Sequence, residues 1–204
     1  MLEPRLKKQT SPKPPANPTA FSEKTILLCI SGSIAAYRAC ELVRELRKRG
    51  ARVFCLMTES AKKFVTPITF RALSGNPVYS DPFSETEDWN IIHTDLADRA
   101  DLILIAPATA DLIARLACGF ADDLVTSVVL ASRRRILVVP AMNDRMYTHP
   151  ATQVNLGKLL EMNYEVMKPI EGDLVCGRTA IGHIPSLDAI LSRAELMFSR
   201  PNSI

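Results

Sequence analysis

The chain has 204 residues, of which 47% are hydrophobic and 23% are charged, and its formal net charge is +3. This composition is typical of a globular protein with one apolar core, and the small charge gives no reason to expect a nucleic-acid surface. No apolar run approaches the ~20 residues that a membrane helix needs. The five scattered cysteines lack metal-ligand spacing and suit a reducing cytosol, so we expect no metal site, no membrane partner and a cytoplasmic location.

The N-terminal segment has a composition of its own. Residues 1–22 contain five prolines, with Ser, Thr, Lys and Asn between them. Such a segment cannot bury enough apolar surface to offset the entropy lost on ordering. The sequence therefore predicts a disordered tail over residues 1–22 and a single domain over residues 23–204.

Strands and helices alternate through the rest of the chain. Apolar runs predict strands at 25–30, 52–57, 101–106, 136–139 and 165–168. Helical spacing of apolar residues predicts helices at 34–49, 67–73, 109–117, 125–131, 152–161 and 187–198. Pro107 is expected to stop the third strand. This alternation predicts an α/β fold, a three-layer parallel sheet with helices on both faces, of Rossmann-like or flavodoxin-like type.

Small residues follow the first strand. Ser31-Gly32-Ser33-Ile34 opens a helix, so backbone N–H groups and a hydroxyl can approach a phosphate there. The turn lacks G-x-G-x-x-G, which argues against a dinucleotide. Thr58, Glu59 and Ser60 follow the second strand. Glu59 can be read as a ribose-binding acid, but the two flanking hydroxyls favour a mononucleotide phosphate such as that of FMN.

Two later strands are also followed by polar residues. Thr109-Ala110-Asp111-Leu112 comes after the third strand, where Thr109 either caps a helix or lies with Asp111 at the edge of a flavin. Pro140-Ala141-Met142-Asn143 and then Asp144-Arg145-Met146-Tyr147 come after the fourth. Taken alone, Asn143 is more simply a helix N-cap. Ligand sites nevertheless form beyond the carboxyl ends of such strands, where an Asn offers donors and an acceptor.

A histidine and a cysteine complete the candidates for chemistry. His93 precedes a short helix, and a lone histidine is more often structural than catalytic; His149 and His183 compete with it. Cys176, followed by Gly177, lies in a polar loop and taken alone is more often an ordinary thiol. A histidine can exchange a proton near neutral pH, and a thiol can donate one, so both residue types suit acid–base chemistry.

Together these stretches resemble the flavin-containing cysteine decarboxylases. Residues 140–147 are similar to that family's P-x-M-N-x-x-M-W/Y signature, residues 31–37 to its S-G-S/G-I-A-A-Y turn, and His93 to its H-I/T-x-L histidine. P-A-T-A-D-L at 107–112 is more like the coenzyme A branch than the P-x-S-A-N-T of eukaryotic and lantibiotic-type relatives. Residues 176–183 resemble the A-C-G-x-x-G-x-G-R/K flap, with Ala180 replacing a glycine and His183 the basic residue.

The resemblance implies FMN-dependent decarboxylation of 4′-phosphopantothenoylcysteine to 4′-phosphopantetheine, in coenzyme A biosynthesis, by a domain without the fused synthetase. It implies that Asn143 holds the substrate's carboxylate or amide, that His93 acts as base or orienter, and that Cys176 is the acid of the final reduction. Met146 and Gly177 would join Asn143 and Cys176 at the substrate. The cofactor-binding residues that it implies are Gly32, Ser33, Ile34, Thr58, Glu59, Ser60, Thr109, Ala110, Asp111, Leu112 and Ala141.

Other functions stay open at this point. A peptidyl-cysteine decarboxylase would release the ene-thiol and would not need Cys176. A flavin-binding regulatory subunit would need no turnover, and a prenyltransferase of related fold would not require the pair Asn143 and Cys176. The resemblance also implies homotrimers, or multiples of them, with FMN near a subunit interface.

Overall fold

The computed structural model describes residues 18–82, 92–173 and 179–199. Its strands are β1 (Thr25–Ile30), β2 (Arg52–Met57), β3 (Val78–Tyr79), β4 (Leu102–Ala108), β5 (Arg135–Pro140), β6 (Glu165–Val166), β7 (Ile170–Asp173) and β8 (Thr179–His183). Its α-helices are α1 (Ala36–Lys48), α2 (Pro67–Ser74), α3 (Ile92–Arg99), α4 (Ala110–Ala117), α5 (Leu124–Ala131), α6 (Asp144–Thr148), α7 (Pro150–Glu161) and α8 (Leu187–Ser199). A 3₁₀ turn, η1, covers Ala61–Lys63.

The main sheet has the order β3-β2-β1-β4-β5-β6, and all its strands are parallel. This is the strand order of Rossmann folds, so the Rossmann-like alternative describes the topology better than the flavodoxin-like one. The chain reverses its direction across the sheet between β1 and β4. In open α/β sheets a ligand site forms at such a reversal, beyond the carboxyl ends of the strands.

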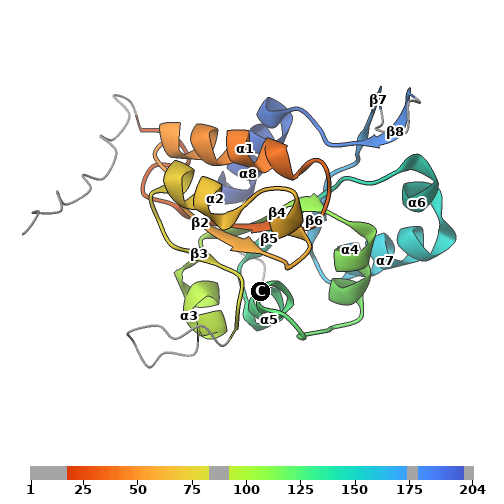
Figure 1. Cartoon of the computed structure of the whole chain (residues 1–204), viewed down its shortest axis with the longest axis horizontal. Coiled ribbons are helices and arrows are strands. Elements are labelled where there is room, and N and C mark those ends of the chain that lie inside the picture. The colour runs from red at the N-terminus through yellow and green to blue at the C-terminus, as the bar shows by residue number, and fades with distance from the viewer. Residues whose placement is uncertain (1–17, 83–91, 174–178, 200–204) are drawn as a thin grey trace, which may run out of the picture.

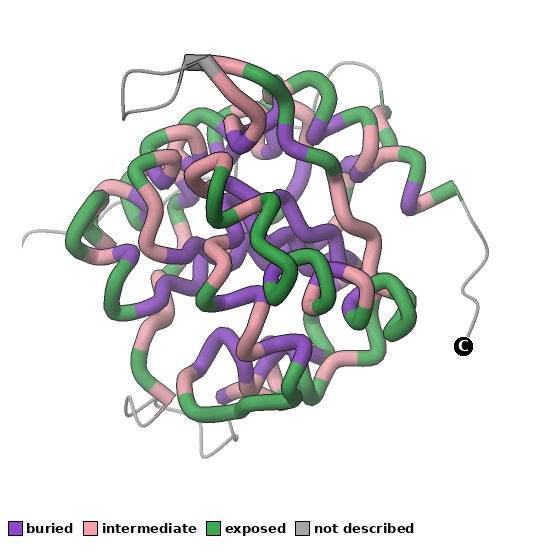
Figure 2. The backbone as a smooth tube through the Cα atoms, turned by 90° about the vertical axis from the view of Figure 1, so that its right-hand side faces the viewer, coloured by how far each residue is buried: buried purple, intermediate pink, exposed green. Residues whose placement is uncertain are grey.

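Helices cover both faces of the sheet, which confirms the predicted three layers (Figure 1). One core lies between the sheet and α1, α2 and α8, and the other lies between the sheet and α3, α4, α5 and α7. Every residue of β1 and β4 is buried, because these central strands have helices on both faces. Figure 2 shows the buried strands inside a shell of half-buried and exposed helices and turns.

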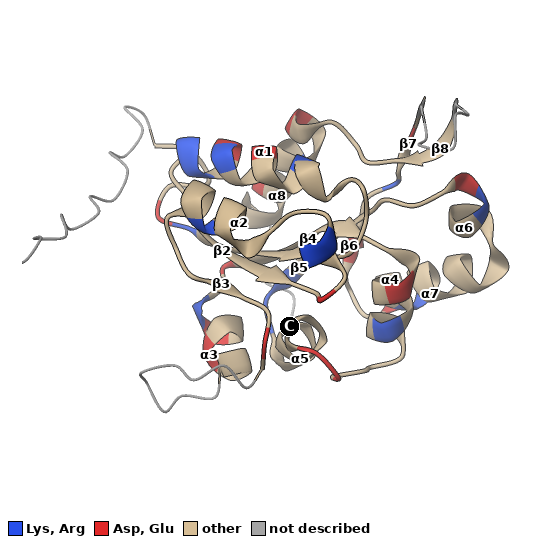
Figure 3. Ribbon diagram, in the orientation of Figure 1, with Lys and Arg blue, Asp and Glu red and all other residues tan. Residues whose placement is uncertain are grey.

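Charged side chains avoid the central strands. Neither β1 nor β4 contains one, and the charges gather on helices, loops and strand ends (Figure 3). The ion pair of Arg193 with Glu165 joins α8 to β6, and Arg49 pairs with Glu195 at 2.9 Å. The first pair joins α8 to the edge strand of the sheet, and the second joins it to the C-terminal end of α1. No described helix is both long and apolar enough to cross a membrane.

Local signals fix the ends of several helices. Pro67 is the first residue of α2, and Gly75 ends that helix with φ of 69°, a conformation that glycine adopts readily. Asp123 and Thr126 form a reciprocal capping box at the start of α5. The helices predicted from the spacing of apolar residues therefore begin and end within a few residues of their expected positions.

The N-terminal boundary of the domain differs from the prediction. Phe21 is fully buried, and its ring packs edge-to-face on Phe198 with centroids 5.7 Å apart. The hydroxyl of Thr19 donates to the carbonyl of Arg49 at 2.5 Å. Packed structure therefore begins by Thr19, before the predicted start at residue 23, because one aromatic residue in a polar segment finds a partner on the last helix.

Pro107 was predicted to stop the third strand, and this prediction is wrong, because β4 continues through Pro107 to Ala108. The pairing of β4 with β5 shifts register between Ile105 and Ala108, and a proline is tolerated at such an irregularity, since no ladder donor is needed there. The Pro107 carbonyl remains in use, because the backbone N–H of Ser31 donates to it at 3.2 Å.

His93 differs from the sequence prediction, because it lies within the first turn of α3 and not before the helix. Cys176 was expected to lie in a polar loop, and the strands on either side of it, β7 and β8, form an antiparallel hairpin. Residues 174–178, between the two strands, lie outside the described residues.

Candidate functional site

The predicted cofactor residues lie mainly at one edge of the sheet, where β2, β1, β4 and β5 end side by side. This edge is on the right of Figure 1, toward α6 and the β7–β8 hairpin, and it faces the viewer in Figure 2. Contacts join each turn to the next in the order of the strands. The sequence could predict each turn separately, but only the sheet order makes them one surface.

The turns after β1 and β2 touch each other. A Cβ added at Gly32 would lie 2.5 Å from both Cβ and Oγ of Ser60, so no larger residue fits there. The Oγ atoms of Thr58 and Ser60 are 3.0 Å apart, and Thr58 is buried. Glu59 is mostly exposed and pairs with Lys62 at 2.5 Å, so its carboxylate is engaged by a neighbour on the same turn.

The turn after β1 has donors suited to a phosphate. The N–H of Ser33 donates to the carbonyl of Ser31, and the N–H of Ala35 donates to the Ser33 hydroxyl. For the N–H groups of Gly32 and Ile34, no hydrogen bond is recorded with any described residue. Two unpaired amides and a hydroxyl at a helix start form the donor set that binds phosphate groups, so these residues fit a phosphate.

Ser31 was not among the predicted site residues, but it holds the turns after β1 and β4 together. Its buried hydroxyl donates to the Pro107 carbonyl at 2.7 Å and accepts from the Thr109 N–H at 2.9 Å. This link lies at the point where the chain reverses its direction across the sheet. The only sequence signal was its position at the end of the first strand.

The turn after β4 supports the simpler interpretation of Thr109. Its side chain accepts from the Leu112 N–H at 3.3 Å and caps α4. Leu112 is fully buried, so its side chain packs in the core under this turn and does not face a ligand. Asp111 is exposed, 3.9 Å from Arg115, and Ala110 is half-buried. Thr109, Ala110 and Asp111 can face a ligand.

The turn after β5 is the last in the row of four turns that follow β2, β1, β4 and β5 at the carboxyl edge of the sheet. The N–H of Ala141, which is buried, donates to the carbonyl of Ala108 at 3.0 Å and ties this turn to the one after β4. Asn143 caps α6, because its Oδ1 accepts from the Arg145 N–H at 3.0 Å. Met146 is exposed on the same short helix. Asn143 is therefore both the N-cap that the simpler interpretation predicts and a polar residue at the predicted ligand edge.

The other predicted catalytic residues are not brought to Asn143 within the described part of one chain. His93 belongs to α3, and Figure 1 shows α3 and α6 far apart on the molecule. Cys176 and Gly177 lie outside the described residues. His149 caps α7, since its Nδ1 accepts from the Ala151 N–H at 3.1 Å, which gives this competing histidine a structural role.

The buried cysteines are not candidates for chemistry. Removal from water raises the pKa of the Cys29 and Cys55 thiols well above the ordinary value. Such thiols stay protonated and unreactive. Across the described ranges, no group of three His, Cys, Asp or Glu side chains could hold a metal ion.

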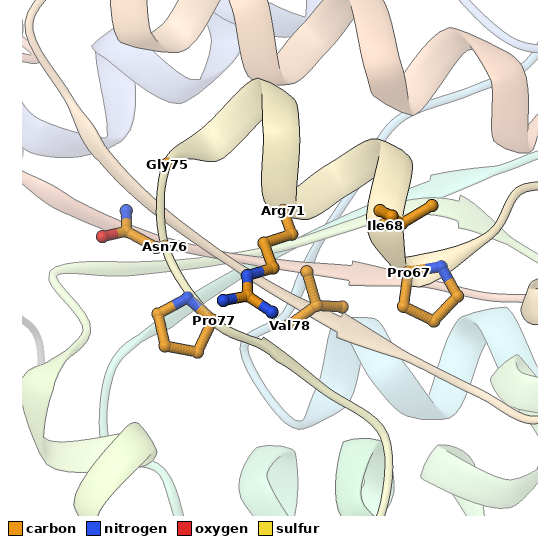
Figure 4. Close-up of a pocket in the computed structure, with 7 residues that line it drawn as sticks. All are labelled: Pro67, Ile68, Arg71, Gly75, Asn76, Pro77 and Val78. Carbon is orange, nitrogen blue, oxygen red and sulfur yellow. The ribbon is translucent and has the colours of Figure 1, made fainter. Parts of the chain in front are cut away.

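A separate pocket of about 570 Å³ lies between α2 and β3 (Figure 4). It is lined by Pro67, Ile68, Arg71, Gly75, Asn76, Pro77 and Val78. None of these seven is a predicted site residue. The pocket is therefore distinct from the row of turns at the carboxyl edge.

Comparisons with known proteins agree with this arrangement. Residues 15–196 match the Flavoprotein family model. The chain is 45% identical over 174 residues to a probable phosphopantothenoylcysteine decarboxylase of Streptococcus mutans, covering 84% of this chain and 97% of that protein. It is 44% identical over 183 residues to the coenzyme A biosynthesis bifunctional protein CoaBC of Bacillus subtilis, covering 90% of this chain. It spans just under half of that longer protein, 45%.

Solved structures share the fold. A mutant PPC decarboxylase complexed with pantothenoylaminoethenethiol superposes with a TM-score of 0.81 at 27% identity, covering 87% of this chain and all of that one, 100%. The FMN-dependent cysteine decarboxylase SpaF superposes with a TM-score of 0.78, also at 27% identity, covering 88% of this chain and 99% of that one.

Proposed function

The chain belongs to the Flavoprotein family, and from that premise we propose that it decarboxylates 4′-phosphopantothenoylcysteine to 4′-phosphopantetheine. The observation that carries the proposal is the continuous row of turns at the carboxyl edge, with Asn143 of the P-A-M-N run at its end. The nearly full-length match to the Streptococcus mutans protein supports this substrate. The similarity to the coenzyme A biosynthesis bifunctional protein CoaBC supports the same pathway.

We propose FMN as the cofactor, since solved relatives are described as FMN-dependent or FMN-binding proteins. The amides of Gly32 and Ile34, with the hydroxyls of Ser33 and Ser60, would hold its phosphate at the start of α1. Thr109, Ala110 and Asp111 would lie along the flavin, with Ala141 and Leu112 packed beneath. When bound, FMN supplies the two-electron chemistry that lets the substrate lose its carboxylate.

The substrate would lie between the cofactor and the turn after β5. Asn143 would donate its side-chain N–H groups to the substrate's carboxylate or amide, with its Oδ1 kept in place by the Arg145 amide. Met146, exposed on α6, would cover the substrate. Cys176 would donate the proton of the final reduction. In support, one relative's structure is described as a cysteine-to-serine mutant complexed with an aminoethenethiol, an unsaturated compound.

The first test identifies both the cofactor and the product. We expect the denatured protein to release FMN, and we expect the native protein to convert 4′-phosphopantothenoylcysteine to carbon dioxide and 4′-phosphopantetheine, measured by mass spectrometry. A peptide with a C-terminal cysteine serves as the competing substrate. Release of FAD or NAD would contradict the cofactor, and faster turnover of the peptide would favour a peptidyl-cysteine decarboxylase. FMN without turnover of either would favour a regulatory subunit.

We further propose that the site forms between subunits of a homotrimer or a multiple of it. The separation of α3 from α6 supports this, because His93 and Asn143 would meet only if a second copy supplies one of them. A site shared between identical chains is an ordinary consequence of cyclic symmetry.

Mixed oligomers test the shared site. His93→Asn and Asn143→Asp are each expected to release no carbon dioxide when expressed alone. When the two are co-expressed with different affinity tags and hybrid oligomers are isolated, some sites combine an intact His93 with an intact Asn143, and activity is expected to return. Inactive hybrids would mean that both residues serve the same chain's site. A monomer with bound FMN in sedimentation would contradict the assembly.

A further inference from the structure

The hairpin of β7 and β8 contains one residue that does not pair across it. Ile170 faces His183 and Glu171 faces Ile181, so Gly182 is the extra residue of a β-bulge. Gly182 is buried and has φ of 137°, a conformation that residues with a side chain rarely adopt. The bulge therefore leaves the Gly182 backbone available for a contact outside the hairpin.

That contact is with the turn that carries Asn143. The N–H of Met142 donates to the carbonyl of Gly182 at 3.2 Å. A Cβ added at Gly182 would lie 2.2 Å from the carbonyl oxygen of Met142 and 3.4 Å from the N–H nitrogen of Asp144. Gly182 thus bonds to the residue before Asn143, and a side chain at this position would also reach the residue after it. The atom that would clash is a backbone oxygen, which cannot rotate away as a side chain could.

We infer that Gly182 is a positioning residue: its backbone holds the turn at Met142–Asp144 and so sets the position of Asn143 against the substrate. The inference rests on the proposed function for its activity measurement. A shift of about 1 Å in a positioned group can cost about 10²-fold in rate, so a contact this close to Asn143 bears on turnover.

Gly182→Ala tests the contact before any turnover is measured. We expect the holoenzyme variant to keep its FMN, while the amide of Met142 exchanges with deuterium faster than in the wild type because its acceptor has moved. Gly172→Ala is the matched control, because it adds the same methyl group to the facing strand, where the new atom would meet the side chain of His183 at 3.0 Å and not the Asn143 turn. Unchanged exchange at Met142 in Gly182→Ala would overturn the inference.

The activity measurement asks whether Gly182 acts through Asn143. We expect Gly182→Ala to lower carbon dioxide release about 10- to 100-fold, and Gly172→Ala to lower it less than about 3-fold. In an Asn143→Ser background, which keeps a helix cap but removes the carboxamide, Gly182→Ala is expected to have no further effect. Equal losses in both backgrounds would show that Gly182 acts independently of Asn143, against the inference.

The two measurements separate this inference from the proposed function. If the wild type does not turn over 4′-phosphopantothenoylcysteine, the proposed function fails, and amide exchange at Met142 still decides whether Gly182 holds the turn. If turnover of the Asn143→Ser variants is too slow to measure, the same double-mutant cycle is run on the dissociation constant of 4′-phosphopantetheine. Additive changes in that constant would then count against the inference.

Discussion

Asn143→Asp is expected to stop carbon dioxide release while leaving the fold and the bound FMN intact. Aspartate keeps the oxygen that accepts from the Arg145 N–H, and it is as good a helix N-cap as asparagine. It loses both side-chain donors, and it places a negative charge where the substrate's carboxylate would bind. A lost hydrogen bond to a charged group costs about 2 kcal/mol, and like-charge contact costs several more, so we expect a loss of at least ~10³-fold.

The control for this experiment is Asn163→Asp, the same chemical change on an exposed residue at the end of α7. Carbon dioxide release is measured together with the visible flavin spectrum and the melting temperature. A variant that melts early or loses FMN would point to a structural role for Asn143, limited to its cap. Normal turnover by Asn143→Asp would remove Asn143 from the chemistry.

Cys176→Ser is expected to separate decarboxylation from the final reduction. Serine has nearly the shape of cysteine but is a far weaker acid, and the reduction of the unsaturated product is the step that needs the proton. Loss of such an acid typically costs ~10²–10⁴-fold in the step that it serves. We therefore expect about one carbon dioxide per site, followed by accumulation of the ethenethiol in place of 4′-phosphopantetheine.

Mass spectrometry of the product in a single turnover decides the outcome. Cys118→Ser is the matched control, since it makes the same change at an exposed thiol at the end of α4. If Cys176→Ser makes saturated 4′-phosphopantetheine at the normal rate, Cys176 has no part in the reaction. Cys176 would then no longer favour the coenzyme A branch over a peptidyl-cysteine decarboxylase.

The sequence by itself determined the elements whose signals are local. The apolar runs of β1, β2 and β5 and the caps at Thr109 and Asn143 depend on residues only a few positions apart. Alternation of strands and helices was therefore enough to predict a three-layer parallel sheet. Because the carboxyl ends of parallel strands share one edge, the same pattern also indicated where a ligand would bind.

Only the tertiary structure decided how those pieces meet, since each remaining feature depends on residues far apart in the chain. The hydroxyl of Ser31 joins a residue 78 positions away, and Phe21 is buried against the last helix. The bulge in the hairpin places Gly182 against Met142, which belongs to a different turn. The local sequence does not predict which residues make such contacts or become buried by them, because the partner residue comes from a distant segment of the chain.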